Sequence, residues 1–388
     1  MDNPKKKIAV IGCGHRSQSV LTNLFKANPD AIEITALMDP SQESIHEIKK
    51  TLAPNAVTYP TEKELLDHSK CDWVFIGSPN CHHANQAIAA LQSGKHVFCE
   101  KPLATTLEDC IQLQQALAQA PDRSFFFGLV LRYTPLYAKI KEIIDSGELG
   151  RILSFEFNET LDFNHGGGIH GNWRRNRSLA GTHLLEKCCH DIDIANWLTG
   201  SLPLRVASFG DRDFFTPANK AFAESLPRNA QNQKAYHKWG HLTQVDPFSE
   251  GASIVDNQVA IIEYANGTRA SFHTNCNAAI HERRIYIIGA HGTIRANAVT
   301  NIIEFRKIGY ETEVQTINLE NTGSHYGGDS IMGAALSKTI LENTIPLAGL
   351  DDGIRASVSC FGVDEALDTG HVVNLSTRWK QVGLSTVA

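Results

Sequence analysis

Short apolar runs alternate with amphipathic stretches along the first third of the chain. The runs are rich in β-branched and aromatic residues and therefore predict buried strands: KIAVIG, EITALMD, CDWVFIGSP, KHVFCEKP and SFFFGLVL. The stretches HHANQAIAALQSG and TLEDCIQLQQALAQ have helical periodicity, and Thr105 with Glu108 predicts a capping box before the second. Because strands and helices alternate, we expect residues 1–128 to form an α/β domain with a doubly wound parallel sheet.

The pattern changes after residue 128. PLYAKIKEIIDSG predicts a helix, RILSFEFNETL predicts an alternating strand, and HGGGIHGNWRRNRS predicts a glycine-rich loop. Residues 211–253 contain many Pro, Asn and Gln residues and predict loops or a lid. The histidines and aromatic residues of these loops are expected to be structural, among them His170, Tyr236 and Trp239.

The last third of the chain combines strand-like alternation with two helical patterns. QVAIIEYANGTRASFHTN places Asn266 and Gly267 between two alternating segments, which predicts an antiparallel hairpin. RRIYIIGAHGTIRAN and IIEFRKIG extend this alternation, and DSIMGAALSKTILENT and DDGIRASVSCFGVDEALDTG predict helices. We therefore expect residues 129–388 to form an α+β domain with an open, mainly antiparallel sheet.

Composition and charge exclude several classes of protein. The 388 residues include 36 Lys and Arg against 42 Asp and Glu, a formal net charge of −6, which argues against binding to nucleic acid or anionic membranes. The nine cysteines are odd in number and lack a CxxC spacing, which favours free thiols in a reducing compartment. No apolar run approaches the roughly 18 residues of a membrane span, so a cytoplasmic protein is expected.

A glycine-rich turn follows the first predicted strand. AVIGCGHRS places Gly12, Gly14 and Ser17 in a GxGxxG frame, with His15 and Arg16 at its variable positions, directly before a helical pattern. In this context the glycines permit a tight turn and a close approach of the backbone to a pyrophosphate at the helix N-terminus. These five residues are therefore candidate dinucleotide-binding residues, and the alternative is a helix cap in an α/β fold without a nucleotide.

The second predicted strand ends at Asp39, at the distance from the glycines that is typical of a ribose-binding acid. Its carboxylate can accept hydrogen bonds from a ribose 2′-hydroxyl and would repel a 2′-phosphate. Pro40 and Ser41 follow, with no arginine beside them. The sequence therefore favours NAD over NADP as the cofactor.

The segment HLLEKCCHDIDIANWL, His183–Leu198, concentrates acids, histidines and cysteines in one predicted helix. At about 100° per residue one face is apolar, whereas the opposite face carries Glu186, Lys187, His190, Asp193 and Trp197. Three roles are open for this face: a metal site, a solvated surface, or the proton-handling side of an active site. Cys188 and Cys189 point apart and no HExxH pattern is present, so we expect no metal.

A second motif narrows the choice. Ser78–Pro102, SPNCHHANQAIAALQSGKHVFCEKP, resembles the sugar-oxidoreductase family typified by glucose–fructose oxidoreductase and inositol dehydrogenase, the Gfo/Idh/MocA family. The shared pattern is Ser-Pro-Asn, a histidine three residues later, Gly-Lys-His-Val and Glu-Lys-Pro. GLVLRYTP, NWRRNRSLAGTHLLEKCCHDIDIANWLTG, DNQVAIIEYANGTRASF and HYGGDSIM are similar to later family segments, so the resemblance covers nearly the whole chain.

The resemblance implies a Rossmann domain, a nicotinamide cofactor and roles for individual residues. The cofactor-binding residues implied in the second motif are Ser78, Pro79, Asn80, His83, Glu100 and Lys101. His190 becomes the base that accepts the hydroxyl proton, Lys101 stabilises the developing alkoxide, and Glu186 takes the place of a family Asp. The candidate substrate-binding residues are Arg132, Trp173, Arg174 and Lys187.

The expected function is hydride transfer between NAD and a secondary alcohol of a sugar, polyol or sugar derivative. Arg174, Arg175 and Arg177 together hint at an acidic sugar. Two alternatives stay open on the same fold, an NAD-dependent glycosidase acting by transient oxidation, elimination and re-reduction, and a non-catalytic NAD-sensing regulator. The resemblance also implies a homodimer or homotetramer formed through the C-terminal sheet.

Overall fold

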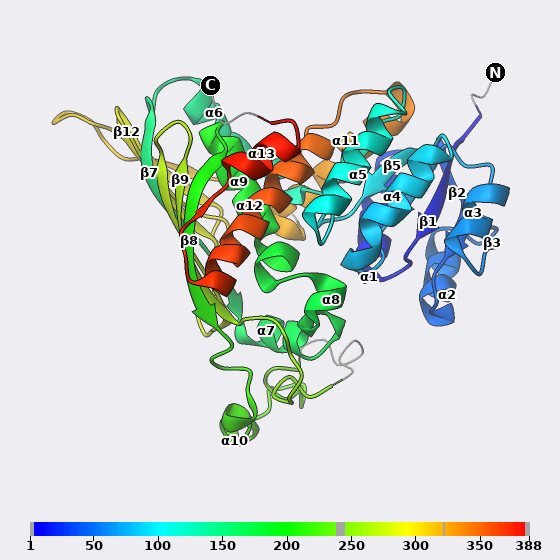
Figure 1. Ribbon diagram of the computed structural model, residues 1–388, viewed down its shortest axis with the longest axis horizontal. Coiled ribbons are helices and arrows are strands. Elements are labelled where there is room, and N and C mark those ends of the chain that lie inside the picture. The colour runs from blue at the N-terminus through cyan, green and yellow to red at the C-terminus, as the bar shows by residue number, and fades with distance from the viewer. Residues whose placement is uncertain (1–3, 238–244, 321–322, 385–388) are drawn as a thin grey trace. The chain divides into compact units, whose positions relative to one another are not determined.

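A computed structural model describes residues 4–237, 245–320 and 323–384 of the chain. Its residues group into two compact units (Figure 1). Unit 1 consists of Met1–Pro135 and Asn321–Ser357, and unit 2 consists of Leu136–Glu320 and Val358–Ala388. A segment from the far end of the chain therefore returns to the first unit. The predicted domain boundary between residues 128 and 129 stays a prediction.

A six-stranded sheet forms the centre of unit 1, in the order β3-β2-β1-β4-β5-β6, and its strands pair in parallel. The strands are β1 Lys6–Ile11, β2 Ile32–Met38, β3 Val57–Thr58, β4 Trp73–Ile76, β5 His96–Cys99 and β6 Phe125–Phe127. The predicted doubly wound parallel sheet is confirmed. Its order reverses between β1 and β4, and doubly wound sheets bind ligands at the carboxyl ends of the strands beside such a reversal.

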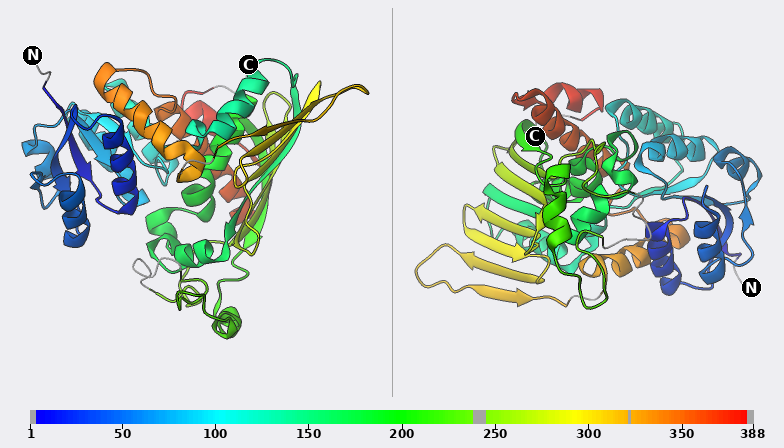
Figure 2. Two further views of the ribbon diagram at one scale, coloured as in Figure 1. Left: turned by 180° about the vertical axis from the view of Figure 1, so that it is seen from behind. Right: turned by 90° about the horizontal axis from the view of Figure 1, so that it is seen from below.

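Helices cover both faces of this sheet (Figures 1 and 2). They are α1 His15–Ala27, α2 Gln42–Thr51, α3 Glu62–His68, α4 His83–Gln92, α5 Leu107–Ala118 and α11 Gly328–Glu342. On one face, α1, α2 and α11 pack on the strands, and the shared apolar core includes Leu21, Ile48 and Leu336. On the other face, α4 packs beside α5. The returning segment thus completes the core of the first unit.

The predicted capping box of α5 is wrong by one residue. The N-cap is Thr106, whose hydroxyl accepts a hydrogen bond from the backbone N–H of Asp109 at 3.1 Å and donates one to the Asp109 carboxylate at 2.7 Å. Two Thr-x-x-acid frames overlap here, Thr105 with Glu108 and Thr106 with Asp109. Local pattern cannot choose between them, because both frames satisfy the same capping rule.

A nine-stranded sheet forms unit 2, in the order β14-β13-β12-β11-β7-β10-β9-β8-β15. The strands are β7 Ile152–Asp162, β8 Pro203–Asp211, β9 Asn257–Tyr264, β10 Arg269–Ala278, β11 Arg284–Gly289, β12 Gly292–Asn297, β13 Ile302–Lys307, β14 Gln315–Asn318 and β15 Val373–Asn374. The β7–β10 pair is parallel, and the other described pairs are antiparallel. The predicted mainly antiparallel sheet is confirmed, as is the β9–β10 turn, where Gly267 has φ 83°.

One face of the nine-stranded sheet is covered by helices, and the other is bare (Figures 1 and 2). The covering helices are α6 Pro135–Asp145, α7 Phe163–His170, α9 Cys189–Thr199, α12 Leu350–Thr369 from Val358 onward, and α13 Ser376–Gln381. Several apolar side chains of the bare face are exposed, among them Phe209 at 71%, Val259 at 44% and Ile261 at 60%.

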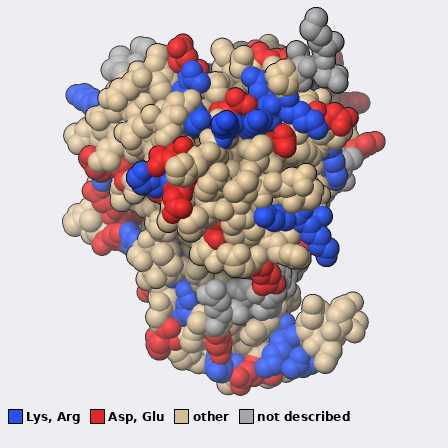
Figure 3. All heavy atoms as spheres, turned by 90° about the vertical axis from the view of Figure 1, so that its right-hand side faces the viewer, with Lys and Arg blue, Asp and Glu red and all other residues tan. Residues whose placement is uncertain are grey.

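Charged side chains of both signs are interspersed on the face shown in Figure 3. This arrangement agrees with the slightly negative net charge of −6. Among the residues that the structure describes, no helix has the length and apolar character needed to cross a membrane. All nine cysteines are free thiols, and eight of them are buried.

The predicted glycine-rich loop after β7 is wrong, because its first half is helix α7. The Asp162 side chain caps this helix by accepting a hydrogen bond from the backbone N–H of Asn164 at 3.0 Å. A Cβ on Gly166 would lie 1.8 Å from the Cys276 carbonyl oxygen, and one on Gly167 would lie 2.1 Å from that of Tyr236. These glycines therefore serve close packing of two backbones, which the composition of the segment does not distinguish from flexibility.

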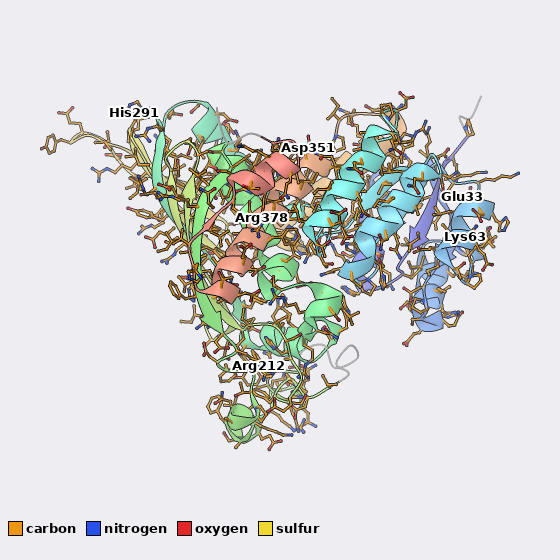
Figure 4. The ribbon with its side chains drawn as sticks, viewed as in Figure 1. Glu33, Lys63, Arg212, His291, Asp351 and Arg378 are labelled. Atoms are coloured by element: carbon orange, nitrogen blue, oxygen red, sulfur yellow. The ribbon has the colours of Figure 1, made fainter. Side chains whose placement is uncertain are left out.

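The long polar stretch between β8 and β9 contains an ordered core. It includes the short helix α10 Lys220–Ser225, and Arg212, labelled in Figure 4, pairs with Glu250 at 3.5 Å. Phe215, Tyr236 and Phe248 form a buried cluster, on which the His170 ring stacks at 4.4 Å from Phe215. Residues 238–244, with Trp239 among them, lie outside the described residues.

Asp256 holds the start of this stretch. Its buried carboxylate accepts hydrogen bonds from the backbone N–H groups of three consecutive residues, Asp213, Phe214 and Phe215, at 2.9, 2.9 and 2.7 Å. Burial raises the pKa of this carboxyl, and the three N–H groups oppose the shift.

Asp256→Ala is expected to leave these three N–H groups without their acceptor. The segment around residues 213–215 is expected to lose about 2 kcal/mol of local stability, so its backbone amides should exchange roughly 30-fold faster. Hydrogen–deuterium exchange on peptides that cover residues 213–215 measures this change. Asp213→Ala is the matched control, because its carboxylate accepts from the Asn257 side chain at 3.0 Å instead. Equal exchange rates in the two variants would contradict this role of Asp256.

Candidate functional site

The carboxyl ends of four neighbouring strands meet at one level in unit 1. The last residues of β2, β1, β4 and β5 are register partners. The pairing extends one residue beyond these strands. The backbone N–H groups of Gly12, Gly77 and Glu100 each donate a hydrogen bond of 2.9 Å to the carbonyl oxygen of the last residue in the neighbouring strand. The residues that follow the strands therefore lie side by side: Asp39, Gly12, Gly77 and Glu100.

Gly12 and Gly14 have different surroundings. Gly12 has φ 87°, and a Cβ there would lie 2.4 Å from the Ser78 nitrogen, so the turn after β1 packs directly on the backbone after β4. Gly14 is the N-cap of α1 with φ −66°, and a Cβ there would meet nothing within 4 Å. The space beside Gly14 and the N-terminal N–H groups of α1 fit a pyrophosphate.

Ser17 and His15 occupy opposite sides of the first turn of α1. Ser17 is fully buried, and a Cβ on Gly77 would lie 2.1 Å from its hydroxyl oxygen. Gly77 thus provides the close contact between helix and strand that the third glycine of the motif usually provides. His15 is exposed at the first position of the helix. Gly77 was not among the residues predicted from the sequence, although a glycine directly after a buried strand is a detectable signal.

The Asp39 carboxylate is held by the backbone. One oxygen accepts from the Cys13 N–H at 2.7 Å and the other from the Ser41 N–H at 2.7 Å. Each carboxylate oxygen can accept a further hydrogen bond. Asp39 therefore has a fixed orientation beside the glycine turn and retains capacity for ribose hydroxyls.

Arg16 and Glu100, both predicted cofactor-binding residues, form an ion pair with each other. Arg16 contacts Glu100 at 2.8 Å and Asp329 at 2.7 Å. Burial alone would raise the pKa of Asp329, but His325 at 2.8 Å, Arg16 and Ser324 hold it well below its usual range. The returning segment therefore fixes Arg16 at the start of α1. Direct contact of Arg16 and Glu100 with a cofactor stays a prediction.

His83 links the two parts of the Ser78–Pro102 motif. Its ring nitrogens lie 2.7 Å from the Pro102 carbonyl oxygen and 2.8 Å from the Ser78 carbonyl oxygen. Burial lowers the pKa of His83, and the two carbonyls oppose this shift. The Ser78 hydroxyl donates to the Gln86 side chain at 2.6 Å, and Pro79 and the buried Asn80 begin the turn into α4. These residues shape the edge that the glycine turn faces.

Lys101 and Arg132 complete the predicted residues of unit 1. The Lys101 N–H donates to the Glu100 carboxylate at 3.1 Å, so the arginine-bound Glu100 also positions the Lys101 backbone. Arg132 is 5% exposed, pairs with Asp352 at 3.1 Å and donates to the Leu347 carbonyl at 3.2 Å. Arg132 thereby holds the beginning of α12, and its predicted contact with substrate stays a prediction.

The predicted regular helix over His183–Leu198 is wrong in its first turns. Leu184–Cys188 forms a π-helical turn, and α9 begins at Cys189. A π-turn contains more residues than an α-turn, so the predicted α-helical alignment of Glu186 with His190 does not apply to it. Such turns are frequent at functional sites. Sequence periodicity gives little signal for them, because a single wider turn shifts the pattern by only one residue.

The predicted alternative of a solvated face is also wrong. Glu186, His190 and Asp193 have exposed fractions of 6%, 5% and 1%. The Glu186 carboxylate pairs with the Arg174 guanidinium at 2.9 Å, and this guanidinium lies 4.5 Å from the Trp173 ring centroid. The structure therefore brings together Trp173, Arg174 and Glu186, and the longer arm of Glu compared with Asp is used to reach Arg174.

Lys187 belongs to a buried network of four charges. It contacts Glu159 of β7 at 3.4 Å, while Arg283 contacts Glu159 at 2.8 Å and Asp191 at 2.7 Å. Two acids and two bases balance one another here, which a buried set of charges requires. Arg283 thereby ties the segment that carries His190 to the sheet. The sequence does not predict that Glu159, Asp191 and Arg283 form a group, because no local pattern joins residues so far apart in the chain.

All three arginines that suggested an acidic substrate have protein partners, Arg174 through its pair with Glu186. Arg175 donates to the Ser249 hydroxyl at 2.8 Å and to the Ser249 carbonyl at 2.6 Å. Arg177 pairs with Asp368 at 2.6 Å. Within the described part of the chain, no group of three or more His, Cys, Asp and Glu side chains is arranged to hold a metal ion.

The two glycines of the turn give a matched test. Gly12→Ala is expected to lower the free energy of unfolding by about 3 kcal/mol through the backbone clash and strain. Gly14→Ala is expected to change it by less than about 0.5 kcal/mol but to weaken NAD binding roughly tenfold or more, because a methyl group enters the phosphate space. Urea unfolding and calorimetric titration with NAD measure the two effects. Undiminished NAD affinity in Gly14→Ala would contradict the assignment.

Comparison with known proteins agrees with this geometry. Residues 6–127 match the model of an oxidoreductase family with an NAD-binding Rossmann fold, and residues 137–295 match the Gfo/Idh/MocA C-terminal domain. YteT of Bacillus subtilis (strain 168) is 26% identical over 90% of this chain and 92% of that protein. Levoglucosan dehydrogenase of Pseudarthrobacter phenanthrenivorans (strain DSM 18606 / JCM 16027 / LMG 23796 / Sphe3) is 29% identical over 60% of this chain and 56% of its own length.

Inositol 2-dehydrogenase 2 of Saccharopolyspora erythraea (strain ATCC 11635 / DSM 40517 / JCM 4748 / NBRC 13426 / NCIMB 8594 / NRRL 2338) is 31% identical over 50% of this chain and 53% of its own length. The matches to these two dehydrogenases thus span about half of each relative. The solved structure of levoglucosan dehydrogenase with NADH and levoglucosan has a TM-score of 0.77 at 21% identity, covering 96% of this chain and 99% of that chain, which shows a shared fold. The chain therefore belongs to the Gfo/Idh/MocA family of NAD-binding oxidoreductases.

Proposed function

We propose that the protein transfers a hydride between NAD and a secondary alcohol of a sugar, polyol or sugar derivative. The observation that carries the proposal is the edge of unit 1, where Gly12, Gly14 and the backbone-held Asp39 fit a dinucleotide. Relatives named as inositol and levoglucosan dehydrogenases support an alcohol substrate of this class. Asp39 favours NAD over NADP by charge repulsion, and Arg16, the nearby cation, is already paired with Glu100 and Asp329.

His190 and Lys101 carry the proton chemistry in this proposal. NAD, when bound, supplies the hydride acceptor at its nicotinamide ring. His190 accepts the proton from the substrate hydroxyl, because an imidazole exchanges protons near neutral pH. The Lys101 ammonium stabilises the negative charge that develops on the same oxygen. The Arg283 network supports this role of His190, since it holds the neighbouring Asp191 in place.

Trp173, Arg174, Glu186, Lys187 and Arg132 are proposed to bind the substrate. An indole ring packs on the apolar face of a sugar, and a carboxylate accepts hydrogen bonds from its hydroxyls. Arg174 stacks on Trp173 and pairs with Glu186 through Nε. These contacts support a preorganised polar and aromatic surface. Since Glu186 compensates the charge of Arg174, the proposal favours neutral sugars and polyols over acidic sugars.

Substitution of the two proposed catalytic residues tests the mechanism. Lys101→Ala and His190→Asn are each expected to lower turnover by about 10²- to 10⁴-fold. NAD affinity is expected to change by less than about threefold in His190→Asn, because His190 is not among the predicted cofactor-binding residues. NADH absorbance with a panel of polyols and sugars measures turnover. The double variant is expected to lose less than the product of the single losses, because both groups act on one oxygen.

Lys70→Ala is the control, since this lysine is exposed in unit 1. Unchanged turnover in Lys101→Ala, or strictly multiplicative losses in the double variant, would refute the shared action on one oxygen.

We further propose that the protein forms a homo-oligomer through the bare face of the nine-stranded sheet. The exposed Phe209, Val259 and Ile261 support this, together with a hollow on the same face lined by Glu156, Asn158, Ser271, His273 and Arg284. Apolar side chains beside polar groups are typical of subunit interfaces.

Ile261→Glu is expected to lower the molar mass measured by light scattering at micromolar concentration, because a buried charge without a partner disfavours association. Val57→Glu places the same charge on an exposed valine of unit 1 and is expected to leave the mass unchanged. If both variants keep the mass of the unmodified protein, the proposed interface is wrong.

A further inference from the structure

The segment that carries Glu186 and His190 begins at Thr182. The Thr182 hydroxyl accepts a hydrogen bond from the Leu185 N–H at 3.0 Å, and its carbonyl oxygen accepts one from the Glu186 N–H at 2.9 Å. The preceding Gly181 has φ 78°, and a Cβ there would lie 2.6 Å from the Leu185 side chain. Thr182 therefore defines where the π-turn starts and how its first N–H groups are satisfied.

The Thr182 hydroxyl has a second partner on α12. It donates to the Asp364 carboxylate at 2.5 Å. The same helix contacts this region at two further points, where Asp368 pairs with Arg177 at 2.6 Å and the Ser359 hydroxyl accepts from the Asn196 side chain at 3.1 Å. Through these three contacts, α12 is joined to the segment Arg177–Asn196 at its beginning, near its middle and at its end. Of these, the Thr182–Asp364 hydrogen bond is the one that reaches the π-turn.

Asp364 lowers the stability of the folded state when its carboxyl group is ionised. Its carboxyl is 5% exposed, and burial raises its pKa to about 7, against the opposing effects of the Thr182 hydrogen bond and of Arg177. The other groups that face it are Gln258 of β9 and, on its own helix, Asp368 and Cys360. Because the folded state binds this proton more tightly than the unfolded state, stability falls as pH rises from about 4 to about 7. An ionised Asp364 therefore weakens the fold at neutral pH.

We propose that Asp364 is a positioning residue, whose carboxylate holds Thr182 and thereby the π-turn that presents Glu186 and His190. The effect of Asp364 on catalysis rests on the proposed function. Its effect on the position of the π-turn rests only on the contacts within unit 2. Asp364 orients a neighbouring segment but lowers the stability of the folded protein. Such residues are expected at functional sites, where the residue is retained for activity and not for stability.

Asp364→Asn separates positioning from plain structural support. The amide oxygen still accepts from Thr182, but the hydrogen bond loses its charge and about half of its strength. We expect a higher urea midpoint than the unmodified protein at pH 8, together with a roughly 5- to 20-fold lower kcat and an unchanged KM for NAD. A structural residue would move stability and kcat in the same direction. A lower midpoint together with a lower kcat, or an unchanged kcat, overturns the proposal.

Substitutions at Thr182 provide a readout that needs no substrate. Thr182→Val removes the hydroxyl at nearly constant volume, whereas Thr182→Ser keeps both hydrogen bonds. Hydrogen–deuterium exchange over residues 182–190 is expected to be about tenfold faster in Thr182→Val and Asp364→Asn and unchanged in Thr182→Ser. Equal exchange in the Val and Ser variants overturns the positioning role. If exchange behaves as expected while the unmodified protein shows no turnover on any substrate, the proposed function fails and the positioning role stands.

Discussion

The close contact between Gly12 and the Gly77–Ser78 backbone is the constraint on which unit 1 depends. A Cβ at Gly12 would lie 2.4 Å from the Ser78 nitrogen, so no side chain fits between the ends of β1 and β4. The turn after β1 is therefore short, and Asp39 reaches back to the Cys13 N–H at 2.7 Å. The same compactness leaves the space beside Gly14 open. A ligand-binding edge thus follows from the packing of two backbones, before any side chain contributes specificity.

In unit 2 the corresponding constraint is a set of buried charges. Glu159, Lys187, Asp191 and Arg283 compensate one another, and removal of any one would leave an uncompensated charge in the interior. Buried ion pairs seldom add much net stability, but they define a unique arrangement of the groups that form them. The segment after Gly181 is therefore held to the sheet by Arg283 and to α12 by Asp364. Both attachments act on the stretch that carries Glu186 and His190.

Charge pairing also changes what the candidate residues can do. Arg16 and Arg132 were predicted to bind cofactor and substrate, and Arg175 and Arg177 suggested an acidic sugar. Each of the four pairs with or donates to a protein group. Arg174 differs, because it stacks on Trp173 while it pairs with Glu186. An arginine count is consequently a poor guide to substrate charge. The protein groups that contact each arginine decide whether its guanidinium is available to a ligand.

Sequence patterns were enough to predict the parallel α/β sheet, the mainly antiparallel second sheet, the hairpin at Gly267, the family and the glycine turn with Asp39. These features depend on residue order over short distances, where periodicity and turn preference act. The folded structure was needed to establish the helix at Gly166 and Gly167, the π-turn at Leu184–Cys188, and the pairing of Arg283 with Asp191. It also decided that Thr106, and not Thr105, caps α5. The close packing at Gly166 and the Arg283–Asp191 pair depend on neighbours distant in the chain, a carbonyl and a carboxylate, whose positions no local pattern encodes.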